Sequence, residues 1–207
     1  MRILLILLFI SFSGFSQEEE ERLSKFYLGI GGGVSFIGGD INYYKINYHI
    51  HNYSTGINLT LLNLGYRINK RFGVTVNLNS SAHRISRYGS SSDIGIGYLS
   101  FGGIISVSTK QFTWDIKPQY APSVVGDFGD NILQELGVYE TYLLGKGFVF
   151  GNSLVRSTKQ GFTYSLDLDY LLSYFNKTRI DGIIYDDNST YNSFRIGVGI
   201  RYNLITK

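Results

Sequence analysis

The chain has 207 residues, a formal net charge of +3 and no cysteine. This length is enough for one domain, and the lack of cysteine excludes disulfide bonds, thiolate chemistry and a lipid anchor on cysteine. The net charge is too small, and the basic residues are too scattered, for a surface that binds nucleic acid. Glycine (25), tyrosine (17) and phenylalanine (14) are abundant while proline (2) is rare, a composition typical of a closed sheet with aromatic side chains on its outer face.

The N-terminus has the pattern of an export signal. A basic start at Arg2 is followed by an apolar run over 3–10 and by small residues that include Gly14 and Ser16. We predict cleavage after Ser16, because small residues at these positions fit the cleavage rule. The apolar run is shorter than the roughly 20 residues that a membrane-spanning helix needs. We therefore expect a signal peptide over 1–16, a short exported N-terminal stub over 17–25 and one domain over 26–207.

The first two predicted strands cover 26–37 and 57–68. In the first, apolar residues alternate with glycines at 29, 31 and 33. Period-two alternation indicates a strand whose faces have different environments, and inward glycines let a small barrel coil sharply. The upper half of the second strand is apolar on both faces, which predicts a β-bulge there.

Six more segments alternate in the same way. They cover 72–79, a segment ending at 99–107, 112–120, 147–157, 162–174 and 192–204. The last is the clearest, because its six apolar residues from Phe194 to Leu204 all fall on one face. Recurrence of this pattern after an export signal indicates that the apolar face contacts lipid.

The connections alternate between short and long. Short turns are predicted at 69–71, 109–110 and 158–160, and long connections at 38–55, 83–93, 123–146 and 176–190. The segment 123–146 is compatible with a loop, a short helix or an extra strand. Ser108–Trp114 and Ser157–Tyr164 resemble each other, which favours two turns on the same side and leaves no place for a full extra strand between them. The predicted fold is all-β: an eight-stranded antiparallel transmembrane β-barrel with short periplasmic turns and long extracellular loops.

The chain resembles the small outer-membrane β-barrel proteins of the Bacteroidota, of the OmpA/OmpX-like type that includes PorT-like barrels. The resemblance rests on the signal ending at Ser16–Gln17, the glycine-rich first strand, the segment Leu64–Arg67 and the C-terminal segment Gly197–Leu204. It implies location in the cell outer membrane, with contacts to outer-membrane lipids and to the barrel-assembly machinery. The ending resembles a barrel-assembly signal at Gly199, Tyr202 and Leu204, although Ile205–Lys207 stands where a terminal aromatic residue is usual.

The predicted inward face carries charged residues from four strands. They are Arg67, Asp115, Lys117, Asp167, Asp169, Arg195 and Arg201. Isolated buried charges are costly, and eight strands leave an interior that side chains can just fill. We therefore expect these residues to form salt bridges that plug the lumen. An acid–base pair of Asp167 and Asp169 is less favoured, because no nucleophile stands near them in the sequence.

The histidines are candidates for metal binding. His49 and His51 would share one face of an extended loop, and His83 begins the next long connection. Imidazoles bind zinc and copper, but the flanking residues add no further ligand, so we expect exposed, non-ligating histidines and no metal or cofactor. A hydrolase built on His83 with a neighbouring serine lacks an acid to orient the ring.

Three classes of function are compatible with this barrel. The favoured class is a non-enzymatic barrel that stabilises the envelope or binds a protein partner through its extracellular loops. Candidate contacts lie in the first long connection, at Tyr43, Tyr44, Tyr48 and Tyr53, because clustered exposed aromatic residues mark interaction surfaces. The alternatives are a small-solute channel or accessory part of a secretion machine, and a lipid-modifying membrane enzyme.

Overall fold

The computed structural model describes residues 25–43, 46–87, 90–109, 112–130, 141–157 and 161–204, apart from the side chains of 40–53, 85–92, 128–130 and 157. These residues form the strands β1 (Phe26–Tyr43), β2 (Ile46–Arg67), β3 (Phe72–Arg87), β4 (Ser90–Ser108), β5 (Thr113–Asp130), β6 (Thr141–Ser157), β7 (Phe162–Ile180), β8 (Ile183–Asp186) and β9 (Thr190–Leu204). None of the described residues belongs to a helix of the length and apolarity that crossing a membrane requires.

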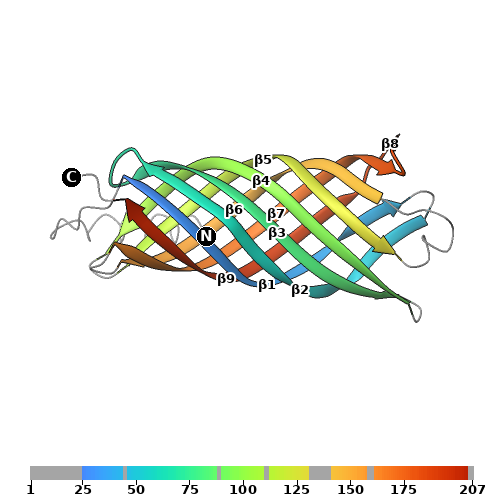
Figure 1. The fold of residues 1–207 in the computed structure, drawn as a ribbon, viewed down its shortest axis with the longest axis horizontal. Coiled ribbons are helices and arrows are strands. Elements are labelled where there is room, and N and C mark those ends of the chain that lie inside the picture. The colour runs from blue at the N-terminus through green and yellow to red at the C-terminus, as the bar shows by residue number, and fades with distance from the viewer. Residues whose placement is uncertain are drawn as a thin grey trace, which may run out of the picture.

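All strands except β8 form one closed ring (Figure 1). Consecutive strands pair antiparallel, and β1 closes the ring by pairing with β9 from Phe26↔Leu204 to Gly38↔Asn192. The predicted all-β barrel of eight antiparallel strands is confirmed. The hairpins β2–β3, β4–β5 and β6–β7 lie at one end of the barrel, which we call the turn end. The opposite end, where β8 lies, we call the outer end.

The outer surface of the ring is an apolar belt. Every long strand contributes exposed large apolar side chains to it, and Val198 on β9 is 66% exposed. From β1 to β9 its side chains include Leu28, Ile30 and Val34 (β1); Ile57, Leu59 and Leu61 (β2); Phe72, Val74 and Val76 (β3); Leu99, Phe101 and Ile105 (β4); Trp114 (β5); Phe148, Phe150 and Leu154 (β6); every second residue from Phe162 to Tyr174 (β7); and every second residue from Phe194 to Leu204 (β9). Such a surface is unstable in water and fits the hydrocarbon interior of a bilayer.

Two β-bulges change which side chains face lipid and which face the lumen. The register of β2 shifts between Thr60 and Leu62, so that both Leu61 and Leu62 turn away from the lumen. This is the bulge that the mixed pattern of the second strand predicted. In β5 a bulge between Ala121 and Val124 places Pro122 and Ser123 on the exposed face.

The strands are longer than predicted, and the predicted long connections are correspondingly shorter. Most of 38–55 belongs to β1 and β2, and most of 83–93 belongs to β3 and β4. The segment 123–146 continues β5 to Asp130 and begins β6 at Thr141, with 131–140 outside the described residues. Within 176–190, β7 continues to Ile180 and β8 follows. The prediction of long loops was wrong because these segments lie beyond the apolar belt, where polar residues face water while the backbone still pairs with its neighbour.

Glycines allow the closing seam between β1 and β9. A Cβ on Gly33 would lie 2.1 Å from the carbonyl oxygen of Ile196, a distance that no side chain can accept. A similar restriction holds at Gly65 on β2, where a Cβ would lie 2.1 Å from the ring of Tyr27. Tyr27 is paired across the strands with Gly65, so its ring covers the glycine from inside the barrel, an arrangement known to support glycine in sheets.

Replacing Gly33 by alanine should therefore weaken ring closure. Overpacking of this kind typically costs about 1–3 kcal/mol, measured here as the free energy of unfolding by urea in lipid vesicles. The control is Gly103→Ala, where the nearest atom to an added Cβ is 4.0 Å away. Equal stability of the two variants would contradict the steric account of the seam.

A charge in the middle of the belt should be costly. Val198→Arg is expected to lower the free energy of unfolding by roughly 2–4 kcal/mol, because arginine at mid-membrane loses its hydration. The matched control is Thr190→Arg, on the same strand but at the outer end, where an exposed cation stays in water. If both substitutions have the same small effect, the apolar face of β9 does not contact lipid.

Candidate functional site

The lumen near the turn end contains a cluster of charged side chains. All seven charged residues expected on the inward face lie in it: Arg67, Asp115, Lys117, Asp167, Asp169, Arg195 and Arg201. They come from β2, β5, β7 and β9, and the closed ring brings them together. The sequence had placed them on the correct face, but only ring closure could show which ones pair.

Asp115 is the centre of this charge cluster. Its side chain is 0% exposed and accepts hydrogen bonds from Arg67 at 3.0 and 3.1 Å. The guanidinium of Arg201 lies 3.1 Å from the same carboxylate, and the hydroxyl of Ser106 donates to it at 2.7 Å. One carboxylate therefore holds two buried guanidinium groups, which would otherwise be uncompensated charges.

Asp167 and Asp169 are also paired. Asp167 lies 3.3 Å from Arg201 and 3.6 Å from Lys117, and it accepts a hydrogen bond from Ser165 at 2.7 Å. Asp169 forms its salt bridge with Arg195 at 2.7 Å. Both carboxylates are thus held by cations rather than by each other, and the arrangement is that of a structural network and not of an acid–base pair.

Above the charge cluster, the outer half of the lumen contains an apolar plug. The side chains that form it come from β1, β4, β5, β6, β7 and β9: Ile37, Ile94, Ile96, Tyr98, Ala121, Val124, Leu143, Val149, Leu171, Phe175 and Tyr191. This apolar plug was missed by the sequence reasoning, although Ile94, Ile96 and Tyr98 alternate with glycines and small residues. The alternation pattern did not reveal the bulge in β5, which turns Val124 toward the lumen.

A small polar cavity of about 10 Å³ lies between the two layers, lined by Asn77, Gln119, Lys117, Asp169 and Arg195 among others. That volume is close to the minimum that holds one water molecule. Gln119 accepts hydrogen bonds from Asn77 at 2.6 Å and from Ser100 at 2.9 Å, so even the neutral residues of this level are tied to one another.

His83 does not lie in an exposed loop. It is 3% exposed, on β3, with its Nε2 atom 3.1 Å from the hydroxyl of Ser35. The prediction of an exposed His83 was wrong because β3 continues past the apolar belt and keeps this side chain in the lumen. The side chains of His49 and His51 lie outside the described residues. Within the described part, no cluster of three or more His, Cys, Asp or Glu side chains is arranged to hold a metal ion.

The other predicted positions lie at the two ends. Gly199 faces the lumen on β9, while Tyr202 and Leu204 face outward at the turn end. Of the tyrosines proposed as contacts, Tyr43 ends β1 and Tyr48 and Tyr53 belong to β2. The side chains of these three, and the whole of Tyr44, lie outside the described residues.

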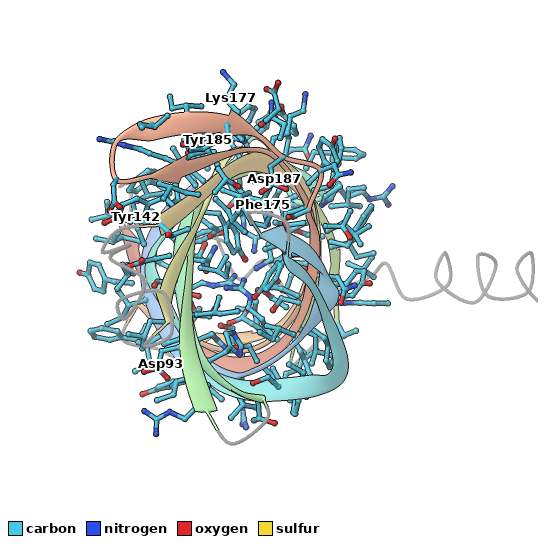
Figure 2. The ribbon with its side chains drawn as sticks, turned by 90° about the vertical axis from the view of Figure 1, so that its right-hand side faces the viewer. Asp93, Tyr142, Phe175, Lys177, Tyr185 and Asp187 are labelled. Atoms are coloured by element: carbon cyan, nitrogen blue, oxygen red, sulfur yellow. The ribbon has the colours of Figure 1, made fainter. Side chains whose placement is uncertain are left out.

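At the outer end the ring is not continuous. β7 and β8 form a hairpin whose turn residues, Asp181 and Gly182, have φ values of 45° and 89°, as in the two-residue turns that match strand twist. β8 pairs with β7 only, and β1 beyond Gly38 pairs with β2 only, among the described strands. Figure 2 looks onto this end, with Tyr185 of β8 and Asp187 labelled.

An exposed ion pair also lies at this end. Arg84 of β3 and Asp93 of β4 are 3.0 Å apart. The hydrogen bond from Arg84 lowers the pKa of the Asp93 carboxyl. Because both groups are fully exposed to water, the pair orients the rim but is expected to add little stability.

No family model matches the chain, and no curated protein is similar to it in sequence. Solved structures are similar in fold. Neisserial surface protein A (NspA) superposes with a TM-score of 0.59 at 12% identity, over 87% of this chain and 98% of that one. OprG from Pseudomonas aeruginosa superposes with a TM-score of 0.53 at 12% identity, over 87% of this chain and 98% of that one. The fold is therefore that of small outer-membrane β-barrels, and the apolar belt makes this chain an integral protein of that membrane.

Removing the central carboxylate should destabilise the barrel strongly. Asp115→Asn leaves Arg67 buried without its anion and Arg201 with Asp167 alone, and removing one partner of a buried ion pair typically costs about 3–5 kcal/mol. The control is Asp93→Asn, which breaks the exposed pair with Arg84 and should change stability little, because water screens exposed ion pairs. Both are measured by urea unfolding in vesicles, and comparable small losses would show that the lumen network contributes nothing to stability.

The filled lumen should not conduct ions. We expect no discrete conductance steps when the purified protein is inserted into planar bilayers at neutral pH, because ions would have to cross the apolar plug without hydration. The conductance of the unaltered protein is compared with that of the double variant Phe175→Ala, Tyr191→Ala, which lacks two rings of the plug that pack against each other. Stable steps from the unaltered protein would contradict a sealed lumen.

Proposed function

We propose that this protein is a non-enzymatic outer-membrane barrel that binds an extended segment of a partner protein at its outer end. The observation that carries the proposal is the interrupted ring: β8 and the end of β1 each have one edge without a strand partner among the described residues. We also propose, from the sequence resemblance alone, that it belongs with the PorT-like barrels of the Bacteroidota.

The edge of β8 has the chemistry to accept another strand. Next to a two-residue turn, Ile180 and Ile183 form the hydrogen-bonded pair, so the N–H and C=O groups of Ile184 are expected to point away from β7. Ile184 is 57% exposed, and the neighbouring Ile183 and Tyr185 are exposed as well. Unpaired backbone groups flanked by apolar side chains are the usual template for addition of a partner strand.

The candidate tyrosines support the same location. Tyr43 lies on the part of β1 that has no β9 partner, and Tyr48 of β2 lies opposite Ile41 of β1. Both positions are therefore at the outer end of the barrel, where the β7–β8 hairpin also lies. A partner segment that pairs with the free edge of β1 would lie next to the backbone of Tyr43.

The alternative functions find less support. A solute channel needs a path through the lumen, and the charge cluster and the apolar plug leave a cavity of about 10 Å³. A lipid-modifying enzyme needs an activated nucleophile or a general base, and the carboxylates of the lumen, Asp115, Asp167 and Asp169, are paired with cations. His83 contacts Ser35 in the buried lumen, where no membrane lipid can reach it.

Assembly of the barrel is the second proposed interaction. Gly199, Tyr202 and Leu204 remain the proposed signal for the barrel-assembly machinery. Tyr202 and Leu204 are exposed at the turn end, and Tyr202 packs against Phe162 of β7 with ring centroids 5.1 Å apart. The turn end would then face the periplasm and the outer end the cell exterior.

Site-specific photo-crosslinking in intact cells tests the proposed partner site. A benzophenone amino acid at Tyr185 should yield a protein adduct, whereas the same group at Tyr164, within the apolar belt, should react with lipid only. Ile184→Pro removes the outward N–H without touching the pairs of Ile183 and Tyr185, and should reduce the adduct at position 185 at least severalfold, while Ile184→Val should not. No adduct at Tyr185 beyond that at Tyr164 would refute a partner at this edge.

A further inference from the structure

The outer surface of β5, β6 and β7 carries a groove that the partner site does not use. The groove has a volume of about 450 Å³ and is lined by Tyr120, Phe148, Leu172, Tyr174 and Lys146. Phe148, Leu172 and Tyr174 belong to the apolar belt, and the rings of Tyr120 and Phe148 pack with centroids 5.4 Å apart. The floor is therefore a rigid aromatic and aliphatic surface that faces the hydrocarbon of the membrane.

Three exposed cations follow the groove toward the outer end. Lys146 lies on its upper edge, opposite Tyr174, and Lys177 and Arg179 lie further out on β7. A bulge of β7 at Asn176 turns Lys177 onto the outward face, opposite Leu144 and diagonal to Lys146. Diagonal neighbours of a sheet are roughly 7–8 Å apart, so the two ammonium groups can reach one phosphate. Figure 2 shows Lys177 at this part of the rim, with Tyr185 of β8 close by.

These cations are not neutralised within the described part of the protein. None of Lys146, Lys177 and Arg179 forms a salt bridge or a side-chain hydrogen bond with another described residue. Two exposed acids lie near them, Asp186 opposite Lys177 and Asp127 opposite Tyr142, without forming an ion pair with any of the three. This differs from the lumen, where every described aspartate and its cations are paired.

We propose that this groove binds one anionic membrane lipid, with an acyl chain along the aromatic floor and the headgroup phosphate between Lys146, Lys177 and Arg179. A hydrocarbon chain is the occupant that fits a groove within the lipid-facing belt, since no aqueous ligand reaches it. Cations at the edge of the belt lie at headgroup depth, where they attract anionic rather than zwitterionic lipids. The proposal does not depend on the partner site at β8.

Native mass spectrometry of the folded protein in detergent micelles tests the proposal. The micelles contain either phosphatidylglycerol or phosphatidylcholine of the same chain length, and the retained lipid is titrated. We expect one phosphatidylglycerol to be retained at concentrations where phosphatidylcholine is not. The triple variant Lys146→Gln, Lys177→Gln, Arg179→Gln should weaken phosphatidylglycerol binding about fivefold per cation, roughly a hundredfold in all.

The matched control removes three exposed cations from the turn end: Lys25→Gln, Arg71→Gln, Arg156→Gln. It should leave binding within about twofold of the unaltered protein, and a heat-modifiable gel shift shows that each variant is folded. Glycerol phosphate added in excess should not displace the lipid, because it lacks the acyl chain. Equal retention of both lipids, equal effects of both triple variants, or displacement by glycerol phosphate would each overturn the assignment.

Discussion

The structure depends on one constraint: inside a bilayer, each backbone N–H and C=O group must find its partner within the protein. The pairing of β1 with β9 meets this constraint, because it turns an open sheet into a ring without edges across the apolar belt. The glycines of the seam follow from it. A side chain at Gly33 would press against the backbone of β9, and the two strands could not approach to hydrogen-bonding distance.

Closure of the ring also explains the lumen. Eight strands enclose a space that side chains can just fill, and the inward residues fill it in two layers. The charged ones near the turn end neutralise one another around Asp115 and Asp167, and the apolar ones near the outer end pack into a plug. A sealed interior leaves the outer surface and the outer end as the parts that can meet other molecules, which is why both proposals lie there.

Alternation in the sequence was sufficient for the fold, because each strand crosses an environment that differs sharply between its two faces. Val198 and Gly197, or Asp167 and Leu168, lie on the faces that their alternation predicted. Strand length was not predictable in the same way. Beyond the belt both faces accept polar residues, so Ser90–Asp93 and Asn176–Ile180 resemble loops although they are paired strands. Partners within the lumen, such as Arg201 with Asp115, are separated by 86 positions and require the register of the whole ring.

The charge cluster and the groove show the same residue types in two roles. Arg195 and Arg201 are buried and compensated, whereas Lys177 and Arg179 are exposed and form no salt bridge with another described residue. In the sequence both pairs lie in strands whose residues alternate between apolar and polar. Nothing in the spacing of these cations distinguishes one with a structural role from one that can bind a ligand. The difference arises from the face of the sheet, which for Lys177 depends on one bulge residue at Asn176.

Hydrogen–deuterium exchange in lipid bilayers, resolved to single amides, tests the closed ring most directly. Slow exchange of paired amides reports the free energy of opening them. The account predicts that the seam amides from Ile30 to Val34 exchange as slowly as those in the middle of β3, and that the amide of Ile184 exchanges many times faster. Seam amides that exchange as fast as Ile184 would show that β1 and β9 do not close the barrel.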